Sequence, residues 1–334
     1  MPMPAGQKVF IYILGVLLGI LILKVIPRNE TSDEPHPWHA QTAVEGSYPM
    51  AIVDDLGREM TLTRQPRWMV SLAPSITEML FAMEMGDHLT AVTAWDEYPA
   101  KAKLLRDSGG NLGSMDALDV AMIKDLRPQL VFATGHTPKA ILEAISNPPA
   151  TVVVSLEHKT IAGIYEDIGN IGRITGVPGR ALHLINALSE KETFLTDRFN
   201  AASVGQRKTV LLLFSLEDDL SSGGTMGGGT WLDEVIEKAQ GRNIASEHVE
   251  HFGTLPLETI REENPDCILI MKPNGSEKRA QLENQVERLA TQSGWSELDA
   301  VRGGEVFWVE AGPFQVPGPR FVEAIQTVGE ALWD

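Results

Sequence analysis

The feature that most constrains the fold is a series of short apolar runs separated by segments with helical spacing. The runs occupy residues 69–73, 89–94, 130–133, 151–156, 209–216, 267–271 and 305–310. Runs of this length, bounded by turn residues, are typical of buried strands. Because strands that alternate with helices build parallel sheets, the sequence predicts an α/β protein with mostly parallel sheets. Its 334 residues exceed what one core usually holds, so we expect two lobes.

Two segments of the chain repeat one pattern. Residues 119–133 (DVAMIKDLRPQLVFA) and 256–270 (PLETIREENPDCILI) each predict a helix, a proline that ends it, and a buried strand. They align when Ile123 is placed on Ile260. Short units of this kind also match by chance, but the repeat favours two similar lobes with one cleft between them.

Residues 177–203, between the two copies, predict one long helix. Pro178 suits its first turn, and the apolar residues that follow keep to one helical face: Ala181, Leu184, Ile185, Leu188, Leu195 and Phe199. At about 1.5 Å per residue, such a helix is as long as a small domain is wide. We therefore expect a rigid connection between an N-terminal lobe at 49–176 and a C-terminal lobe at 204–334.

Residues 69–86 (MVSLAPSITEMLFAMEMG) predict a strand that leads directly into a helix. Ser75 and Glu78 have the spacing of a capping box, so the helix is predicted to begin at Ser75. Free backbone amides at the carboxyl end of a strand are a common ligand position in open α/β sheets. A capped helix with no ligand is the alternative.

Charge and cysteine content exclude several classes of function. The net charge is −17, and 28 basic residues face 45 acidic ones, which argues against a nucleic-acid partner. Cys267 is the only cysteine, so there is no internal disulfide and no zinc site built on thiolates. The sequence carries no nucleophile elbow, no HExxH motif and no close acid pair. None of these features suggests catalysis, so we predict that the chain is not an enzyme and has no cofactor.

An apolar segment at residues 9–26 follows a short N-terminal tail at 1–8. As a helix it would span about 27 Å, close to the roughly 30 Å hydrocarbon core of a bilayer. We predict a single-pass anchor in the cell membrane, with a removed signal peptide as the alternative. Residues 27–48 are polar and contain three prolines, so they predict a tether. Lys8 precedes the segment, and Lys24 and Arg28 flank its other end, so charge does not specify its orientation.

Several motifs, in one order, resemble the periplasmic binding proteins for iron chelates and vitamin B12. The motifs are VSLAPSITEMLFAMEMGDHLTAVTAWDEYP, LRPQLVFA, GGGTWLDEVIEKAQGRNIA, LPLETIREENPDCILI, SGWSELDAVRGGEVFWV and PGPRFVEAI. The resemblance covers about residues 50–332. It implies two α/β lobes bridged by one long helix, with the folded part on the extracytoplasmic side. The rigidity of that helix predicts small opening motions. It also implies capture of a metal chelate (cobalamin, a ferric siderophore or heme) between the lobes, and delivery to the permease of an ABC transporter.

The resemblance further implies aromatic side chains around the ligand. Trp95 stands where the vitamin B12 binder of this family has a tyrosine, and Phe252 stands where it has a tryptophan. The third aromatic position falls near Met115, which departs from that pattern. The remaining candidates for ligand binding lie in predicted cleft loops: Ser75, His136, Phe314 and Arg320.

The resemblance implies docking on the transporter through one surface glutamate in each lobe, but this chain matches only one of the two positions. Glu258 matches that position in the C-terminal lobe. The N-terminal equivalent is Ala121, with Asp116 and Asp119 nearby. Symmetric docking is therefore not expected.

Two other classes of function stay open. Histidines at 136, 248 and 251, with Glu250, could hold a metal ion, either for metal binding or for catalysis on a small anionic substrate. A tethered sensor without a transporter is the other class, and Ala121 favours it.

Three weaker signals concern the ligand. Lys272 and Arg320 are candidate partners for an anionic ligand group. The run GGTMGGGT at 223–230 lacks the lysine of a P-loop, so we expect it to allow close approach to a ligand or to lead into a helix capped near Thr230.

Overall fold

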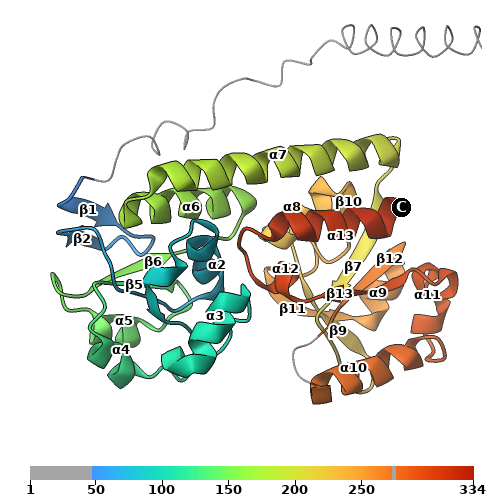
Figure 1. Cartoon of the computed structure of the whole chain (residues 1–334). Coiled ribbons are helices and arrows are strands. Elements are labelled where there is room, and N and C mark those ends of the chain that lie inside the picture. The colour runs from blue at the N-terminus through green and yellow to red at the C-terminus, as the bar shows by residue number, and fades with distance from the viewer. Residues whose placement is uncertain (1–46, 273–275) are drawn as a thin grey trace, which may run out of the picture. The chain divides into compact units, whose positions relative to one another are not determined.

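The computed structural model describes residues 47–272 and 276–334 (Figure 1). The predicted tail, anchor and tether lie outside these residues, except for residues 47 and 48. Within the described part of the chain, no helix is both long and apolar enough to cross a membrane.

The N-terminal lobe is built on a parallel sheet with the strand order β4-β3-β5-β6. Its strands are β3 (Met69–Ser71), β4 (Leu89–Ala91), β5 (Leu130–Thr134) and β6 (Val152–Leu156). Every residue of β3, β5 and β6 is buried, because helices cover both faces of a parallel sheet. The apolar runs of the sequence therefore predicted these strands correctly.

The C-terminal lobe has a second parallel sheet, with the order β10-β7-β12-β13. Its strands are β7 (Lys208–Leu213), β10 (Gly241–Asn243), β12 (Cys267–Lys272) and β13 (Val306–Glu310). In both lobes the first strand in chain order lies between the second and the third, with the fourth beyond the third. The prediction of two similar α/β lobes is confirmed.

Helices cover both sheets. Those of the N-terminal lobe are α2 (Pro74–Ala82), α3 (Ala100–Leu105), α4 (Val120–Leu126), α5 (Lys139–Ile145) and α6 (Ile161–Thr175). Those of the C-terminal lobe are α8 (Trp231–Lys238), α9 (Leu257–Glu263), α10 (Ser276–Leu289), α11 (Asp299–Gly303), α12 (Gly312–Gln315) and α13 (Phe321–Trp333). Short helical turns occupy Gly86–His88 (η2), Arg106–Gly110 (η3) and Trp295–Glu297 (η4).

Each lobe has its own buried apolar cluster. In the N-terminal lobe, residues of α4 and α5 pack on β3, β5 and β6, with Ile123 and Leu142 among them. In the C-terminal lobe, α9, α10 and the segment around Trp295 pack on β7 and β12. These clusters fix the sheets and leave the loops at the strand ends free to vary.

The long helix α7 (Pro178–Ser203) packs against α6 of the N-terminal lobe and α13 of the C-terminal lobe (Figure 1). Its buried residues include Ala181 and Ile185 near one end, and Leu195 and Phe199 near the other. Phe199 is in close contact with Gly329 of α13, where no Cβ atom would fit. The helix is therefore anchored in both lobes by apolar contacts.

The repeated segments form the same unit in both lobes. Arg127 caps the C-terminus of α4, and Asn264 caps that of α9. Both residues have the left-handed backbone conformation, and each is followed by a proline and a buried strand. The two strands, β5 and β12, hold the same position in the two sheets. The structure confirms the repeat that the sequence indicated.

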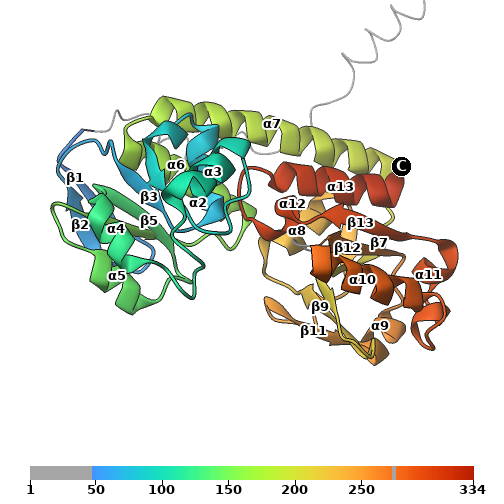
Figure 2. The same cartoon turned by 60° about the horizontal axis from the view of Figure 1, so that its bottom comes forward.

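Two small antiparallel sheets lie outside this frame. One pairs β1 (Met50–Val53) with β2 (Glu59–Leu62). The other contains β8 (Ser215–Leu216), β9 (Ser222–Met226) and β11 (Phe252–Pro256), and Figure 2 shows β9 and β11 side by side in the C-terminal lobe. The sequence did not predict β9, because its glycines are typical of a loop. The predicted cap at Thr230 is confirmed: its hydroxyl accepts a hydrogen bond from the amide of Asp233 at the start of α8.

The predicted capping box at Ser75 and Glu78 is wrong. Helix α2 begins at Pro74, after Ala73, and no side chain caps it. Pro74 has no amide hydrogen to satisfy, so the helix can start there without a polar cap. Ser75 is buried, and the Glu78 carboxylate instead bonds to Arg320, which is 242 residues away along the chain.

Candidate functional site

The segments that follow the sheet strands meet where the two lobes touch. After β13, a Cβ atom at Gly318 would lie 3.6 Å from both the Ser75 carbonyl oxygen and the Glu78 carboxylate of α2. At a second contact, the Glu234 carboxylate of α8 accepts a hydrogen bond of 2.7 Å from the amide of Ile161, the first residue of α6. In open α/β sheets, ligands bind beyond the carboxyl ends of the strands. Here both lobes bring those ends to a shared interface.

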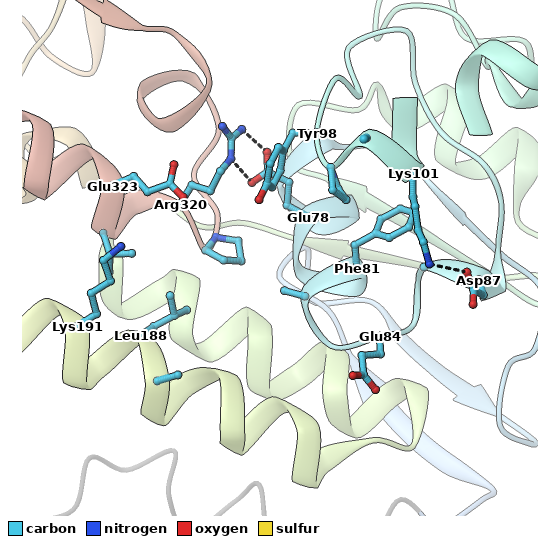
Figure 3. Close-up of a pocket in the computed structure, with 17 residues that line it drawn as sticks. Glu78, Phe81, Glu84, Asp87, Tyr98, Lys101, Leu188, Lys191, Arg320 and Glu323 are labelled. Atoms are coloured by element: carbon cyan, nitrogen blue, oxygen red, sulfur yellow. Dashed lines mark hydrogen bonds and ion pairs between the residues drawn. The ribbon is translucent and has the colours of Figure 1, made fainter. Parts of the chain in front are cut away.

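An ion pair joins the lobes at this interface (Figure 3). The Arg320 guanidinium donates two hydrogen bonds to the Glu78 carboxylate, of 2.9 Å from Nε and 2.5 Å from Nη2. The same guanidinium stacks over the Tyr98 ring, with 4.3 Å between its central carbon and the ring centroid. Burial raises the pKa of Glu78 to about 7, although Arg320 acts in the opposite direction. Arg320 is thus committed to a partner within the protein.

A pocket of about 690 Å³ lies between this ion pair and α7. It is lined by the C-terminal half of α2, residues 98–101, one face of α7 and the start of α13. Figure 3 shows Lys101 and Asp87 on its N-terminal-lobe side, with Nζ and Oδ1 3.9 Å apart. Among the predicted ligand residues, Arg320 is the one that lines this pocket, and neither Trp95 nor Phe252 lines it.

In the N-terminal lobe, a short loop after β4 exposes an aromatic side chain. Trp95 is 57% exposed. The loop is held by the buried carboxylate of Asp96, which accepts hydrogen bonds from the Thr93 amide (2.8 Å) and hydroxyl (2.6 Å). Burial raises the pKa of Asp96, and the Thr77 and Thr93 hydroxyls act against that rise. Asp96 therefore fixes the backbone on which Trp95 is presented.

In the C-terminal lobe, two phenylalanines form an aromatic pair. Phe252, at the start of β11, is 66% exposed, and its ring meets the Phe214 ring edge-on at a centroid distance of 6.2 Å. Phe214 directly follows β7, and the glycine at position 224 leaves room for its ring. Sequence reasoning missed Phe214. Its position at the carboxyl end of the first strand of this lobe was a signal that could have identified it.

The other predicted ligand residues differ in how far they are exposed. His136 is exposed in the loop after β5, and Met115 is half-buried in the segment before α4. Ser75 and Phe314 are buried, 4% and 1% exposed, so neither presents its side chain to a ligand in this conformation. That Trp95 and Phe252 contact one ligand from opposite sides stays a prediction.

The histidines of the metal-site hypothesis have other surroundings. His248 Nε2 lies 3.2 Å from a Glu263 carboxylate oxygen. His251 is exposed and has a positive φ of 63°. Within residues 47–272 and 276–334, no group of three or more His, Cys, Asp or Glu side chains is arranged to hold a metal ion. No described geometry supports the metal hypothesis.

The predicted docking positions lie in the first turns of corresponding helices. Glu258 is exposed at the start of α9, and Ala121 is exposed at the start of α4. Asp119 is occupied as the cap of α4, since its carboxylate accepts a hydrogen bond of 2.8 Å from the Met122 amide. Asp119 is therefore a poor substitute for a docking glutamate.

Two α/β lobes with a shared strand order, a helix anchored in both, and aromatic side chains exposed at the strand ends define a two-lobed ligand-binding protein. A family model described as "Periplasmic binding protein" matches residues 69–311, and the chain belongs to this family. Members of the family are substrate-binding proteins of ABC importers, a class of transport proteins and not of enzymes.

Curated relatives and a solved structure agree with this assignment. The chain is 26% identical over 292 residues to the ABC transporter substrate-binding lipoprotein YvrC of Bacillus subtilis, covering 86% of each chain. It is 25% identical over 268 residues to a vitamin B12-binding protein of Pectobacterium carotovorum, covering 80% of this chain and 88% of the relative. The heme-binding protein RhuT of Roseiflexus shares its fold with a TM-score of 0.68 at 23% identity, covering 80% and 98% of the two chains.

These findings correct the predicted location. The sequence predicted a single-pass membrane protein from residues 9–26, which lie outside the described residues. The Bacillus subtilis relative is a lipoprotein, and no helix of the described residues is suited to span a membrane. The single-pass prediction is therefore wrong and is not retained.

Proposed function

We propose that this protein captures a metal chelate between its lobes and delivers it to an ABC importer. The observation that carries the proposal is the exposure of Trp95 and Phe252 in segments that border the two parallel sheets, one in each lobe. Exposed aromatic faces of this size favour a large apolar ligand. Relatives named for vitamin B12 and heme support a chelate of that size.

The proposed mechanism is recognition without covalent chemistry. Removing one aromatic side chain from water stabilises a complex by about 1.5–3 kcal/mol, so three such side chains could provide most of a sub-micromolar affinity. Trp95 would cover one face of the chelate, and Phe252 with Phe214 the other. His136 and Met115 would lie at its edge.

The protein would open only slightly to admit its ligand. Helix α7 is packed on both lobes, and the Arg320–Glu78 pair and the Glu234 contact with Ile161 also join them. Such a connection favours small rotations over wide hinge closure.

Transfer to the importer would use unequal contacts from the two lobes. Glu258 would pair with a basic residue of the permease, while Ala121 leaves the N-terminal lobe without the matching charge. We expect the C-terminal lobe to provide most of the docking energy.

Calorimetric titration tests the proposal. The purified chain is titrated with cyanocobalamin, ferrichrome, ferrioxamine B, hemin and ferric enterobactin, and separately with Zn²⁺. We expect at least one chelate to bind with sub-micromolar affinity and one-to-one stoichiometry. Binding of none of them, or tight binding of Zn²⁺ alone, would refute chelate capture.

A further inference from the structure

The segments that follow the strands of the two parallel sheets carry more acidic than basic residues in the described part of the chain. Residues 92–99, 135–138, 157–160, 244–251 and 311–320 together contain five Asp or Glu residues and two basic ones, Lys159 and Arg320. Clefts lined by charge of one sign attract ligands of the other sign and repel those of the same sign. This imbalance matters because these segments border the proposed ligand site.

The basic side chains at this edge already have acidic partners. Lys159 Nζ lies 3.1 Å from Glu157 Oε1, and Lys272 Nζ, at the end of β12, lies 2.6 Å from Glu310 Oε1. Lys272 was a predicted partner for an anionic ligand, and this contact neutralises it.

Arg106, beneath the Trp95 loop, is held in the same way. It bonds to Glu97 at 2.5 Å and to Asp107 at 2.8 Å, and it also donates to the Ala94 carbonyl. It supports the loop and offers no charge to a ligand.

Arg320 is the most firmly committed of these cations. Two of its donors point at Glu78, and Tyr98 covers its face. The Glu78 carboxylate is 3% exposed. A ligand anion that took Arg320 away would leave this buried carboxylate without its partner, which is one of the costlier changes in a protein interior. Glu78 therefore acts as a built-in competitor for any anionic ligand group.

Building on the chelate capture proposed above, we propose that the site selects chelates whose outer groups are uncharged or cationic and rejects those with free carboxylates or a net negative charge. Amide-bearing corrinoids and hydroxamate siderophores belong to the accepted class. Porphyrins with free propionates and catecholate siderophores belong to the rejected class. The discrimination comes from acidic edges and from cations that are already paired, and needs no steric difference.

The first test compares affinities of the unaltered chain at pH 8, above the pKa of Glu78. The probes are cyanocobalamin, ferrichrome and ferrioxamine B for the accepted class, and hemin and ferric enterobactin for the rejected class. We expect the best accepted chelate to bind at least 100-fold more tightly than either rejected one. Tighter binding of hemin or ferric enterobactin would overturn the charge selection while leaving chelate capture intact. Binding of no chelate would overturn both proposals.

The second test frees Arg320 with Glu78→Gln, which keeps the size of the side chain and removes its charge. We expect hemin or ferric enterobactin to gain at least 10-fold in affinity, with a smaller change for cyanocobalamin. The matched control is Glu330→Gln, which removes the charge from an Arg–Glu pair between α7 and α13. Thermal melting verifies that both variants are folded. If Glu78→Gln and Glu330→Gln give the same affinities for anionic chelates, Glu78 does not select against them.

Discussion

The two lobes share one frame but present their aromatic side chains in different ways. In the N-terminal lobe, Trp95 stands on a short loop held by the buried Asp96. In the C-terminal lobe, Phe252 stands on β11, a strand of an additional antiparallel sheet, and is backed by Phe214. The parallel sheets thus fix where a ligand can sit, while the segments added to them decide what contacts it.

A second difference concerns the outer helices of the repeated unit. Helices α4 and α9 hold corresponding positions in the two lobes, yet the second residue is Glu258 in α9 and Ala121 in α4. The repeat therefore preserved the scaffold and not the surface charge. Variants that alter one lobe at a time can test how far the lobes act separately.

The largest expected effect is on stability. Trp295 of the C-terminal lobe is fully buried, and its indole nitrogen donates to the Leu220 carbonyl at 2.7 Å. We expect Trp295→Ala to lower the free energy of unfolding by about 3–5 kcal/mol. Phe132→Ala, in the core of the N-terminal lobe, is the matched variant and should cost a similar amount.

Urea unfolding followed by circular dichroism checks this comparison. Because α7 is packed on both lobes, each variant should shift one cooperative transition. Two separate transitions, one for each lobe, would contradict the coupling that we assign to α7.

The interlobe ion pair should make stability depend on pH. The pKa of Glu78 is raised from 4.5 to about 7, so the folded chain binds more protons than the unfolded chain between these values. The contribution of Glu78 to stability is therefore complete below about pH 4.5 and is lost as the pH rises through 7. Between pH 5 and pH 8, the melting temperature should fall by a few degrees more in the unaltered chain than in Glu78→Gln.

Glu330→Gln serves as the control for this pH dependence. Glu330 pairs with Arg198 at 3.5 Å, and both side chains are partly exposed. In this variant, the melting temperature should fall between pH 5 and pH 8 as much as it does in the unaltered chain. If it also falls by that amount in Glu78→Gln, Glu78 does not titrate in this range.

Ligand binding should require an aromatic side chain from each lobe. We expect Trp95→Ala and Phe252→Ala each to weaken chelate binding by about 10- to 100-fold, because each removes an aromatic face worth about 1.5–3 kcal/mol. Phe194→Ala, which removes an exposed phenylalanine from α7, should leave the affinity unchanged. Titration calorimetry measures the chelate affinity of all three variants. If only one of Trp95→Ala and Phe252→Ala weakens binding, the site lies on that lobe alone.

The smallest expected effect concerns docking. We expect Glu258→Ala to lower the affinity for the importer by roughly 5-fold, since one exposed ion pair contributes about 1 kcal/mol. Ala121→Glu should raise it by a similar or smaller factor. Glu190→Ala, on an exposed position of α7, is the control. Binding to the importer in nanodiscs provides the readout, and equal losses for Glu258→Ala and Glu190→Ala would remove the docking role.

The fold was largely predictable because its signals are local. Buried strands appear as apolar runs, and the repeated helix-proline-strand unit marks the third strand of each lobe. The glycine-rich strand β9 was not predictable in this way, since its pairing with β11 involves residues distant in sequence. The partner of Glu78 was also not predictable from nearby residues. Its spacing from Ser75 indicated a capping box, whereas its carboxylate bonds to Arg320, which is distant in the sequence.

The candidate site was predictable only in outline. The family resemblance located Trp95 and Phe252 in exposed positions, but it did not reveal that Phe314 is buried or that Lys272 is neutralised by Glu310. It also missed Phe214. Burial and pairing depend on which side chains the fold brings together, and no single motif encodes that.

The most direct test of the account is a crystal structure of the chain with the chelate that binds most tightly. We predict that the chelate lies at the interface of the two lobes and contacts both Trp95 and Phe252, while Arg320 stays bonded to Glu78. A chelate that contacts one lobe alone, or that occupies the pocket beside α7, would contradict the account.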